Sequence, residues 1–323
     1  MHARVRRTPL FGVTWAQLIT AIATRPLSLT PPSGCEQSVT ATWWISVSDT
    51  CGVSVTRTLG RTTGAVVAAL EMDQPQIVTI QRLRDIAADL GISTDARVLA
   101  ARLRNSGWLL PTPIRGTYEF APGSHAGPLG HADPLTPVRA ALHSRPDLEA
   151  ALALESAAWA HNLADRLPNK LEVAIPVGHT APAGLERVAR VLRFTAQLST
   201  VSLRGVPVHA PETLLVHLAY RPSQVRSWTS VGEWLPDLVH AVDGDRVVAE
   251  LEGRDAAVGA RVGYLVSGLR PSLARRMERF IAGRVWFGPR GALRRHNARW
   301  QIADTVLPFD PVSLPPLGSE FAQ

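Results

Sequence analysis

The chain has 323 residues, of which 46% are hydrophobic and 19% are charged, and its formal net charge at pH 7 is +7. This length is enough for two domains, and this composition excludes a chain that is disordered throughout. No uninterrupted apolar run reaches the ~18 residues that a membrane-spanning helix needs. The isoelectric point of about 10.5 favours a polyanionic partner but does not indicate a fold.

The first 57 residues differ from the rest of the chain. They contain both cysteines, Cys35 and Cys51, together with many threonines and serines, and they show no sustained periodicity. Residues 1–57 are interpreted as a disordered extension or as the product of a start codon assigned too far upstream. A signal peptide is the alternative, but polar residues interrupt its apolar region at 10–23. Because the remaining chain has no cysteine, we expect a cytoplasmic protein.

From residue 59 to residue 123 the hydrophobic pattern becomes regular. Pro75 ends a first helix, and the short β-like run "QIVT" follows it. Thr79 is the expected N-cap of a second helix, "IQRLRDIAADLG", which Gly91 closes. Ser93 or Thr94 is the expected N-cap of a third helix, "DARVLAARLRNSG". The runs "WLLPTP" and "TYEFAP" on either side of a turn at 114–116 predict a hairpin.

This order of elements predicts a winged helix-turn-helix, whose second paired helix enters the major groove of DNA while the hairpin reaches the flanking backbone. Arginine suits both positions, because its planar guanidinium pairs with guanine edges or with phosphate. The residues expected to contact DNA lie on the third helix and at the hairpin tip; they are Thr94, Arg97, Arg102, Arg104, Asn105 and Arg115. A winged helix that contacts only protein remains the alternative, since seven arginines and six acids leave 59–123 with little net charge.

Residues 124–133 are rich in glycine, proline and histidine and predict a linker to a second domain at 134–323. In that domain, "VRAALHSRP", "LEAALALESAAWAHNLAD" and "PETLLVHLAYRP" are predicted helices, whereas "KLEVAIPV" and "STVSLRGVPVHAP" are strand-like. The chain ends in a basic helix, "PSLARRMERFIAG", and a hairpin-like segment at 284–309. The predicted fold class is α+β, with an N-terminal winged helix-turn-helix followed by a larger α+β domain.

Motifs that would indicate catalysis are weak. The sequence has no phosphate-binding loop of the G-x-x-x-x-G-K-[ST] type and no G-x-S-x-G nucleophile elbow. Asp243, Asp245, Glu250 and Glu252 are the best candidates for holding Mg²⁺, and they give the alternative of a DNA-binding, metal-dependent nuclease. The same stretch fits an amphipathic helix with solvated acids, and no lysine completes a nuclease signature. We therefore expect no catalytic residues, no metal site and no cofactor.

Five stretches of the chain form a pattern through their order and spacing. They are "LRNSGWLLPTPIRGTYEFAPG", "ALESAAWAHNLADRLP" with the following "LEVAIP", "PETLLVHLAYRP", "ARVGYLVSGL" and "ARWQIADTVLP". Together they resemble the AbiEi family, antitoxins of type IV toxin–antitoxin systems, in its actinobacterial form. The resemblance covers residues 61–308, with departures at Glu155 and Val262, and residues 1–57 have no counterpart in it.

The resemblance implies that the winged helix binds double-stranded DNA at inverted repeats in its own promoter and represses the operon. It implies that the larger domain counteracts a cognate nucleotidyltransferase-like toxin, with or without direct contact, and presents a basic surface. Residues 270–300 hold nine arginines and one acid, and the candidates for that surface are Arg275, Arg276, Arg279, Arg290, Arg294 and Arg295. The alternative is a solvated face without a ligand. We expect no membrane association, and a monomer or a dimer that forms on DNA.

Overall fold

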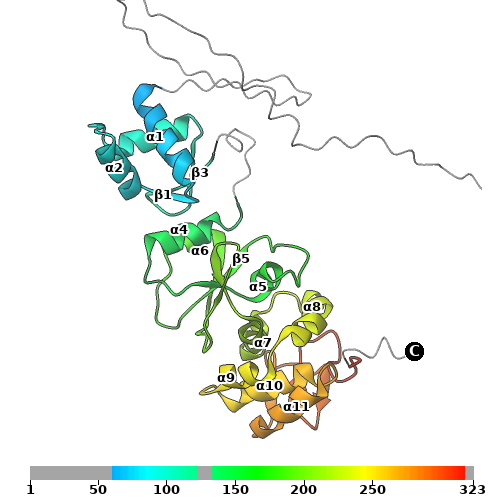
Figure 1. Cartoon of the computed structure of the whole chain (residues 1–323). Helices are drawn as coiled ribbons and strands as arrows, with labels where there is room; N and C mark the ends of the chain where they lie inside the picture. The colour runs from blue at the N-terminus through cyan, green and yellow to red at the C-terminus, as the bar shows by residue number, and fades with distance from the viewer. Residues whose placement is uncertain (1–59, 123–132, 317–323) are drawn as a thin grey trace, which may run out of the picture. The chain divides into compact units, whose positions relative to one another are not determined.

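The computed structural model describes residues 60–122 and 133–316, all of which fall within one compact unit, Trp44–Gln323 (Figure 1). The predicted N-terminal segment at 1–57 lies outside the described residues. The predicted linker at 124–133 also lies outside them, except for Asp133. No helix of the described part is long and apolar enough to cross a membrane.

Three helices and a small antiparallel sheet form the described part before residue 123. In chain order the elements are α1 (Arg61–Asp73), β1 (Ile77–Thr79), α2 (Ile80–Asp89), α3 (Ala96–Asn105), β2 (Leu109–Pro111) and β3 (Thr117–Phe120). The strand order in the sheet is β1-β3-β2, so the β2–β3 hairpin pairs with the strand that lies between α1 and α2. We refer to these elements together as the N-terminal module.

The ends of these helices follow from local side-chain and backbone chemistry. Gln74 adopts a left-handed conformation and closes α1 before Pro75. The hydroxyl of Thr79 accepts a hydrogen bond from the Arg82 amide at 3.0 Å, which confirms Thr79 as the N-cap of α2. Gly91, at φ +64°, follows α2 as predicted, in a conformation that glycine adopts without a steric penalty.

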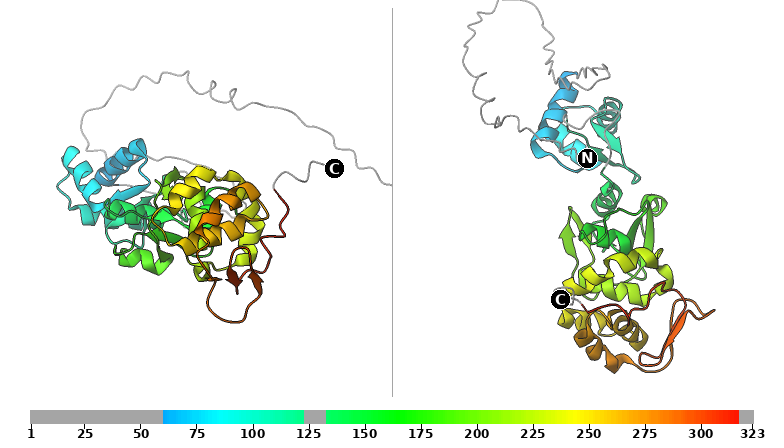
Figure 2. Two further views of the ribbon diagram at one scale, coloured as in Figure 1. Left: turned by 90° about the horizontal axis from the view of Figure 1, so that it is seen from below. Right: turned by 90° about the vertical axis from the view of Figure 1, so that its right-hand side faces the viewer.

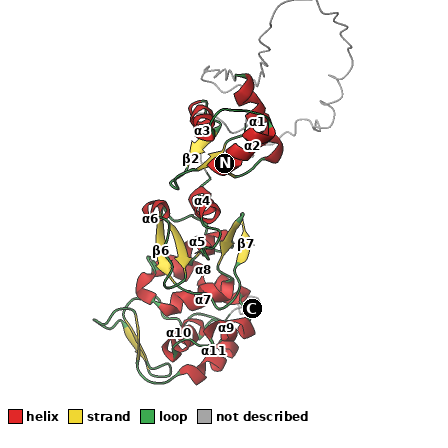
Figure 3. Cartoon of the chain, turned by 90° about the vertical axis from the view of Figure 1, so that its left-hand side faces the viewer, coloured by secondary structure: helices red, strands yellow, loops and turns green. Residues whose placement is uncertain are grey.

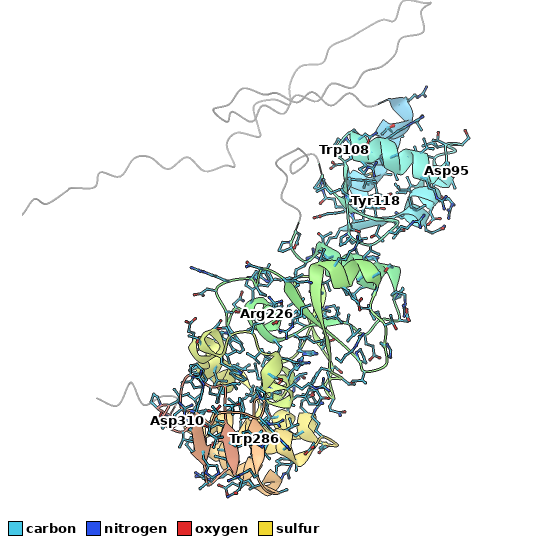
Figure 4. The ribbon with its side chains drawn as sticks, turned by 180° about the vertical axis from the view of Figure 1, so that it is seen from behind. Asp95, Trp108, Tyr118, Arg226, Trp286 and Asp310 are labelled. Atoms are coloured by element: carbon cyan, nitrogen blue, oxygen red, sulfur yellow. The ribbon has the colours of Figure 1, made fainter. Side chains whose placement is uncertain are left out.

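The prediction of Ser93 or Thr94 as the N-cap of α3 is wrong. Asp95 caps this helix, and its carboxylate accepts a hydrogen bond from the Arg97 amide at 2.7 Å (Figure 4). A carboxylate at this position gains from the positive end of the helix dipole as well as from the hydrogen bond, so the acid takes the cap that the preceding hydroxyls would offer.

A five-stranded mixed sheet forms the centre of the larger domain. Its strands are β4 (Ala151–Leu152), β5 (Leu171–Ile175), β6 (Ala189–Arg193), β7 (Val201–Leu203) and β8 (Val206–Val208). The order is β6-β5-β4-β8-β7, and Figure 3 shows β6 and β7 at the two edges. A short helix, α6 (Ala183–Val188), connects the parallel strands β5 and β6.

Helices surround this sheet and continue beyond it. They are α4 (Thr136–Ser144), α5 (Leu154–Ala160), α7 (Pro211–Tyr220), α8 (Trp228–Ala241), α9 (Gly244–Leu251), α10 (Ala256–Val266) and α11 (Pro271–Met277), with short 3-10 turns η2 (Pro222–Gln224) and η3 (Glu278–Phe280). Helices α5, α7 and α8 contact one another, and α5 packs on β5. The combination of helices with largely separate sheets confirms the predicted α+β class.

The prediction of one continuous helix at 148–165 is wrong. Ala151 and Leu152 instead form β4, which pairs with β5 on one side and β8 on the other. Leu154 then adopts a positive φ of 47°, and α5 begins there. The alanine-rich composition favours a helix, but the pairing of β4 within the sheet outweighs that weak local preference.

The C-terminal segment is also more complex than the predicted hairpin. Its strands are β9 (Val285–Phe287), β10 (Arg295–Asn297) and β11 (Ile302–Asp304), and β11 pairs with β10 in antiparallel and with β9 in parallel orientation. Figure 2 shows these orange-to-red strands beside α10 and α11. Trp300 is fully buried against α10, where a Cβ on Gly263 would lie only 2.2 Å from the Trp300 ring.

Candidate functional site

The first candidate site is the outer surface of α3. Arg97, Arg102, Arg104 and Asn105 are all exposed, while Thr94 is half-buried just before the helix. The core face of the same helix is closed by Ala96, Leu99, Ala100 and Leu103. Within the described residues, the three arginine side chains form no hydrogen bond or ion pair, so their guanidinium groups face solvent.

The arginines of the neighbouring helix α2 are arranged differently. Arg82 forms an ion pair with Asp73 at the end of α1, and Arg84 donates a hydrogen bond to Gln81. The five arginines of the two helices therefore fall into two groups: the two on α2 have internal partners, and the three on α3 are free cations. The free cations lie on the helix that the sequence pattern predicted to enter the major groove of DNA.

Arg115 lies at the tip of the β2–β3 hairpin and is exposed. Hydrogen bonds fix the turn around it, because the Thr112 and Thr117 hydroxyl oxygens lie 2.6 Å apart and the Ile114 carbonyl oxygen lies within hydrogen-bond distance of both, at 3.1 and 2.8 Å. The Arg115 side chain is thus carried on a defined turn. Its neighbour Ile114 is buried, which the sequence pattern did not predict.

The arginines predicted to form a basic surface divide into two sets. Arg295 is partly buried, and its guanidinium donates to the buried Asp304 carboxylate at 2.9 Å and to the carbonyls of Leu307 and Phe309 at 3.1 and 2.5 Å. Arg276 pairs with Asp245. Arg279 lies over the ring of Phe280. Arg275, Arg290 and Arg294 are exposed, and their side chains have no hydrogen-bond or ion-pair partner within the described residues.

The carboxylates at 243–252 do not share a common set of partners. Asp243 caps α9 by accepting hydrogen bonds from the Asp245 and Arg246 amides at 2.7 and 3.1 Å, and these bonds lower the pKa of its carboxyl. Glu250 is fully buried. It accepts from the amides of Gln197 and Leu198, from the Thr213 hydroxyl at 3.0 Å and from Arg254.

The structure therefore does not bring these acids together as metal ligands. No group of three or more histidine, cysteine, aspartate or glutamate side chains suited to a metal ion occurs in the described residues.

A further buried acid, Glu172 on β5, was not singled out from the sequence. Its carboxylate accepts from the Glu155 amide at 3.0 Å and from Arg190 at 2.9 Å, and Arg226 approaches to 3.5 Å. Burial raises the pKa of Glu172, against the opposing effects of these partners. The only signal in the sequence is an acid inside the apolar strand "LEVAI", which indicates a buried charge with partners.

The central sheet and the helices around it are similar to known proteins. Residues 150–267, from the start of β4 to the end of α10, match the family described as the AbiEi antitoxin C-terminal domain. The crystal structure of the RV2827C protein from Mycobacterium tuberculosis is similar to this chain, with a TM-score of 0.67 and 26% sequence identity. That similarity covers 78% of this chain and 94% of the other. A search of curated proteins gave no match.

These findings relate residues 150–267, within the larger α+β domain, to a class of antitoxin domains. The match to the AbiEi antitoxin C-terminal domain confirms the family resemblance over residues 150–267 and supports an antitoxin role in a toxin–antitoxin system. The matched region ends at residue 267, so the arginine-rich segment at 270–299 lies beyond it. The N-terminal module also lies outside the matched region.

Proposed function

We propose that this protein is a non-catalytic, cytoplasmic antitoxin of a type IV system that also represses its own operon. In this proposal residues 59–123 form a winged helix-turn-helix that binds double-stranded DNA, and residues 134–323 form the antitoxin domain that counteracts a cognate nucleotidyltransferase-like toxin. The observation that carries it is the AbiEi domain match, joined in one chain to a helix with three unpaired arginines.

The free arginines of α3 support DNA binding. In the proposed complex α3 enters the major groove, where Arg97 and Arg104 reach base edges and Arg115 reaches the flanking phosphates. A bidentate arginine–guanine contact contributes about 1–3 kcal/mol of discrimination against the wrong base. Each phosphate contact adds about one unit to the dependence of log Kd on log salt concentration.

The test measures binding of the purified full chain to its own promoter repeats and to a scrambled duplex at several salt concentrations. Arg97→Ala or Arg104→Ala should reduce the preference for the repeats by about tenfold or more, since about 1.4 kcal/mol corresponds to a factor of ten. Arg115→Ala should weaken both duplexes alike.

Arg84→Ala is the matched control, because it removes an arginine that has an internal partner on the neighbouring helix. It should leave the preference unchanged. Equal affinity of the unmodified protein for repeats and scrambled DNA would disprove the repressor part of the proposal.

The antitoxin part is tested by co-expression with the nucleotidyltransferase-like protein expected beside it in the operon. The unmodified chain should restore growth, and replacing the exposed Arg275, Arg290 and Arg294 together by alanine should reduce that protection. Unchanged protection by a stably folded triple variant would remove the basic surface from the proposal.

Inverted repeats further lead us to expect a monomer in solution and two protomers per operator, which light scattering with and without DNA measures.

A further inference from the structure

The tip of the β2–β3 hairpin lies against α6 of the antitoxin domain. Ile114 is 7% exposed, and it belongs to the hydrophobic cluster of the antitoxin domain and not to the cluster of the N-terminal module. The Arg187 guanidinium of α6 donates a hydrogen bond to the Pro113 carbonyl at 3.2 Å. At this hairpin tip Arg115 is therefore polar and exposed, whereas the preceding Ile114 is apolar and buried.

A glycine permits this approach. A Cβ placed on Gly184 of α6 would lie 2.0 Å from the Pro113 carbonyl oxygen and 2.9 Å from the Ile114 Cδ1 atom. The first of these atoms belongs to the backbone, so no side-chain rotation relieves the overlap. An alanine at this position thus requires the hairpin to move away from α6.

Other residues of the same sheet also contact the antitoxin domain. On β1, Val78 packs into the N-terminal module, whereas the adjacent Ile77 belongs to the cluster of the antitoxin domain. Helix α4 contacts both β1 and β3. The Glu119 carboxylate of β3 accepts a hydrogen bond from the Asp133 amide at 3.2 Å. The sheet therefore covers its own helices with one face and contacts the antitoxin domain with the other.

We propose that the β2–β3 turn is an internal docking element, for which Gly184 is the receiving position, and that it holds the N-terminal module and the antitoxin domain as one body. The occupant of the α6 surface is the Pro113–Ile114 segment of the same chain. The position of α3 is then set by the antitoxin domain as well as by its own fold. This inference does not depend on DNA binding or on antitoxin activity.

The test is Gly184→Ala in the full chain, followed by hydrogen exchange and small-angle scattering. Alanine has a higher helix propensity than glycine. Without docking, the substitution would therefore leave the stability of the protein unchanged or raise it. With docking, the amides of Ile114 and Thr117 should exchange at least tenfold faster, because their hydrogen-bonded turn loses its cover. The radius of gyration should increase as the two parts separate.

Gly291→Ala is the control, because a Cβ there would meet nothing within 4 Å. It should change neither exchange nor scattering. Ile114→Ser provides a second variant that leaves α6 intact and should accelerate exchange in α6 itself; circular dichroism establishes that both variants are folded. Unchanged exchange and an unchanged radius of gyration in folded Gly184→Ala would overturn the proposal, as would a response of Gly291→Ala equal to that of Gly184→Ala.

Discussion

The two hydrophobic clusters of this chain differ in what they enclose besides apolar side chains. The cluster of the N-terminal module is made of residues such as Leu70, Leu83 and Leu99, and the module has no buried charged residue within its described part. The antitoxin domain buries several ionisable residues, namely Arg139, Glu172, His209, Glu212, His217, Glu250 and Asp304. The charged side chains of the module thus lie outside its core, whereas part of the charge in the antitoxin domain is buried and maintains the fold.

The strongest test of this difference is the removal of Glu250. Glu250→Ala leaves two amides, the Thr213 hydroxyl and the Arg254 guanidinium without their acceptor. Breaking a buried charged pair in this way should lower the free energy of unfolding by about 4 kcal/mol. Urea denaturation of the full chain measures the loss.

A charge removed from the N-terminal module provides the comparison. Arg104→Ala should change the free energy of unfolding by no more than about 0.5 kcal/mol, as is usual for exposed substitutions. If Glu250→Ala were as mild as Arg104→Ala, the buried network would not be stabilising the antitoxin domain.

Two adjacent arginines repeat the comparison at a smaller scale. Arg295→Ala removes the partner of the fully buried Asp304, which also accepts from the Val306 and Leu307 amides, and should cost about 3 kcal/mol. Arg294→Ala, one residue earlier and exposed, should cost less than about 0.5 kcal/mol. The thermal unfolding midpoints of the two variants test this difference. Equal midpoints would contradict the structural role assigned to Arg295.

A last difference is a dependence of stability on pH that we expect in the antitoxin domain. Burial, followed by the nearby Arg254, lowers the pKa of His209 to about 3. Burial also lowers the pKa of His217 well below its ordinary value, with added repulsion from His209, Arg254 and Arg190. The ring of His217 stacks on Phe194 at 4.1 Å, and neither ring nitrogen has a protein partner within the described residues.

These histidines are neutral when folded but bind protons when unfolded below pH 6.5. Stability is therefore fully present above that pH and falls as pH decreases from 6.5 towards the folded-state values, by up to about 1.4 kcal/mol per pH unit for each histidine. His217→Leu should reduce the slope between pH 6 and pH 4.5 by about half. An unchanged slope in that variant would assign the acid sensitivity to other groups.

Local chemistry made much of the N-terminal module predictable. The Thr79 cap and the glycine that ends α2 each follow from neighbouring residues, and each was predicted correctly. The α3 cap was missed because three consecutive residues offer a capping oxygen, and the advantage of the Asp95 carboxylate at the helix dipole was not weighed against the two hydroxyls. The second burial face of β1 was also missed, although two adjacent apolar residues in a short strand indicate that both faces are covered.

The antitoxin domain was harder to predict because distant contacts determine its structure. Residues 151–152 form a strand only because β5 and β8 lie on either side of them. The roles of Arg294 and Arg295 differ through one contact with Asp304, and no pattern within "LRRHN" distinguishes the two. The candidate positions on α3 could be proposed from spacing alone, whereas sorting the C-terminal arginines required the folded contacts.

The burial of Trp300 against Gly263 explains why two distant sequence stretches belong together. The Trp300 ring occupies the space that a side chain at position 263 would need. The stretches "VGYL" and "ARWQ" are therefore sterically complementary. Evolution can then enlarge position 263 only in a lineage where position 300 has already become smaller. In an alignment of homologues, positions 263 and 300 should therefore covary.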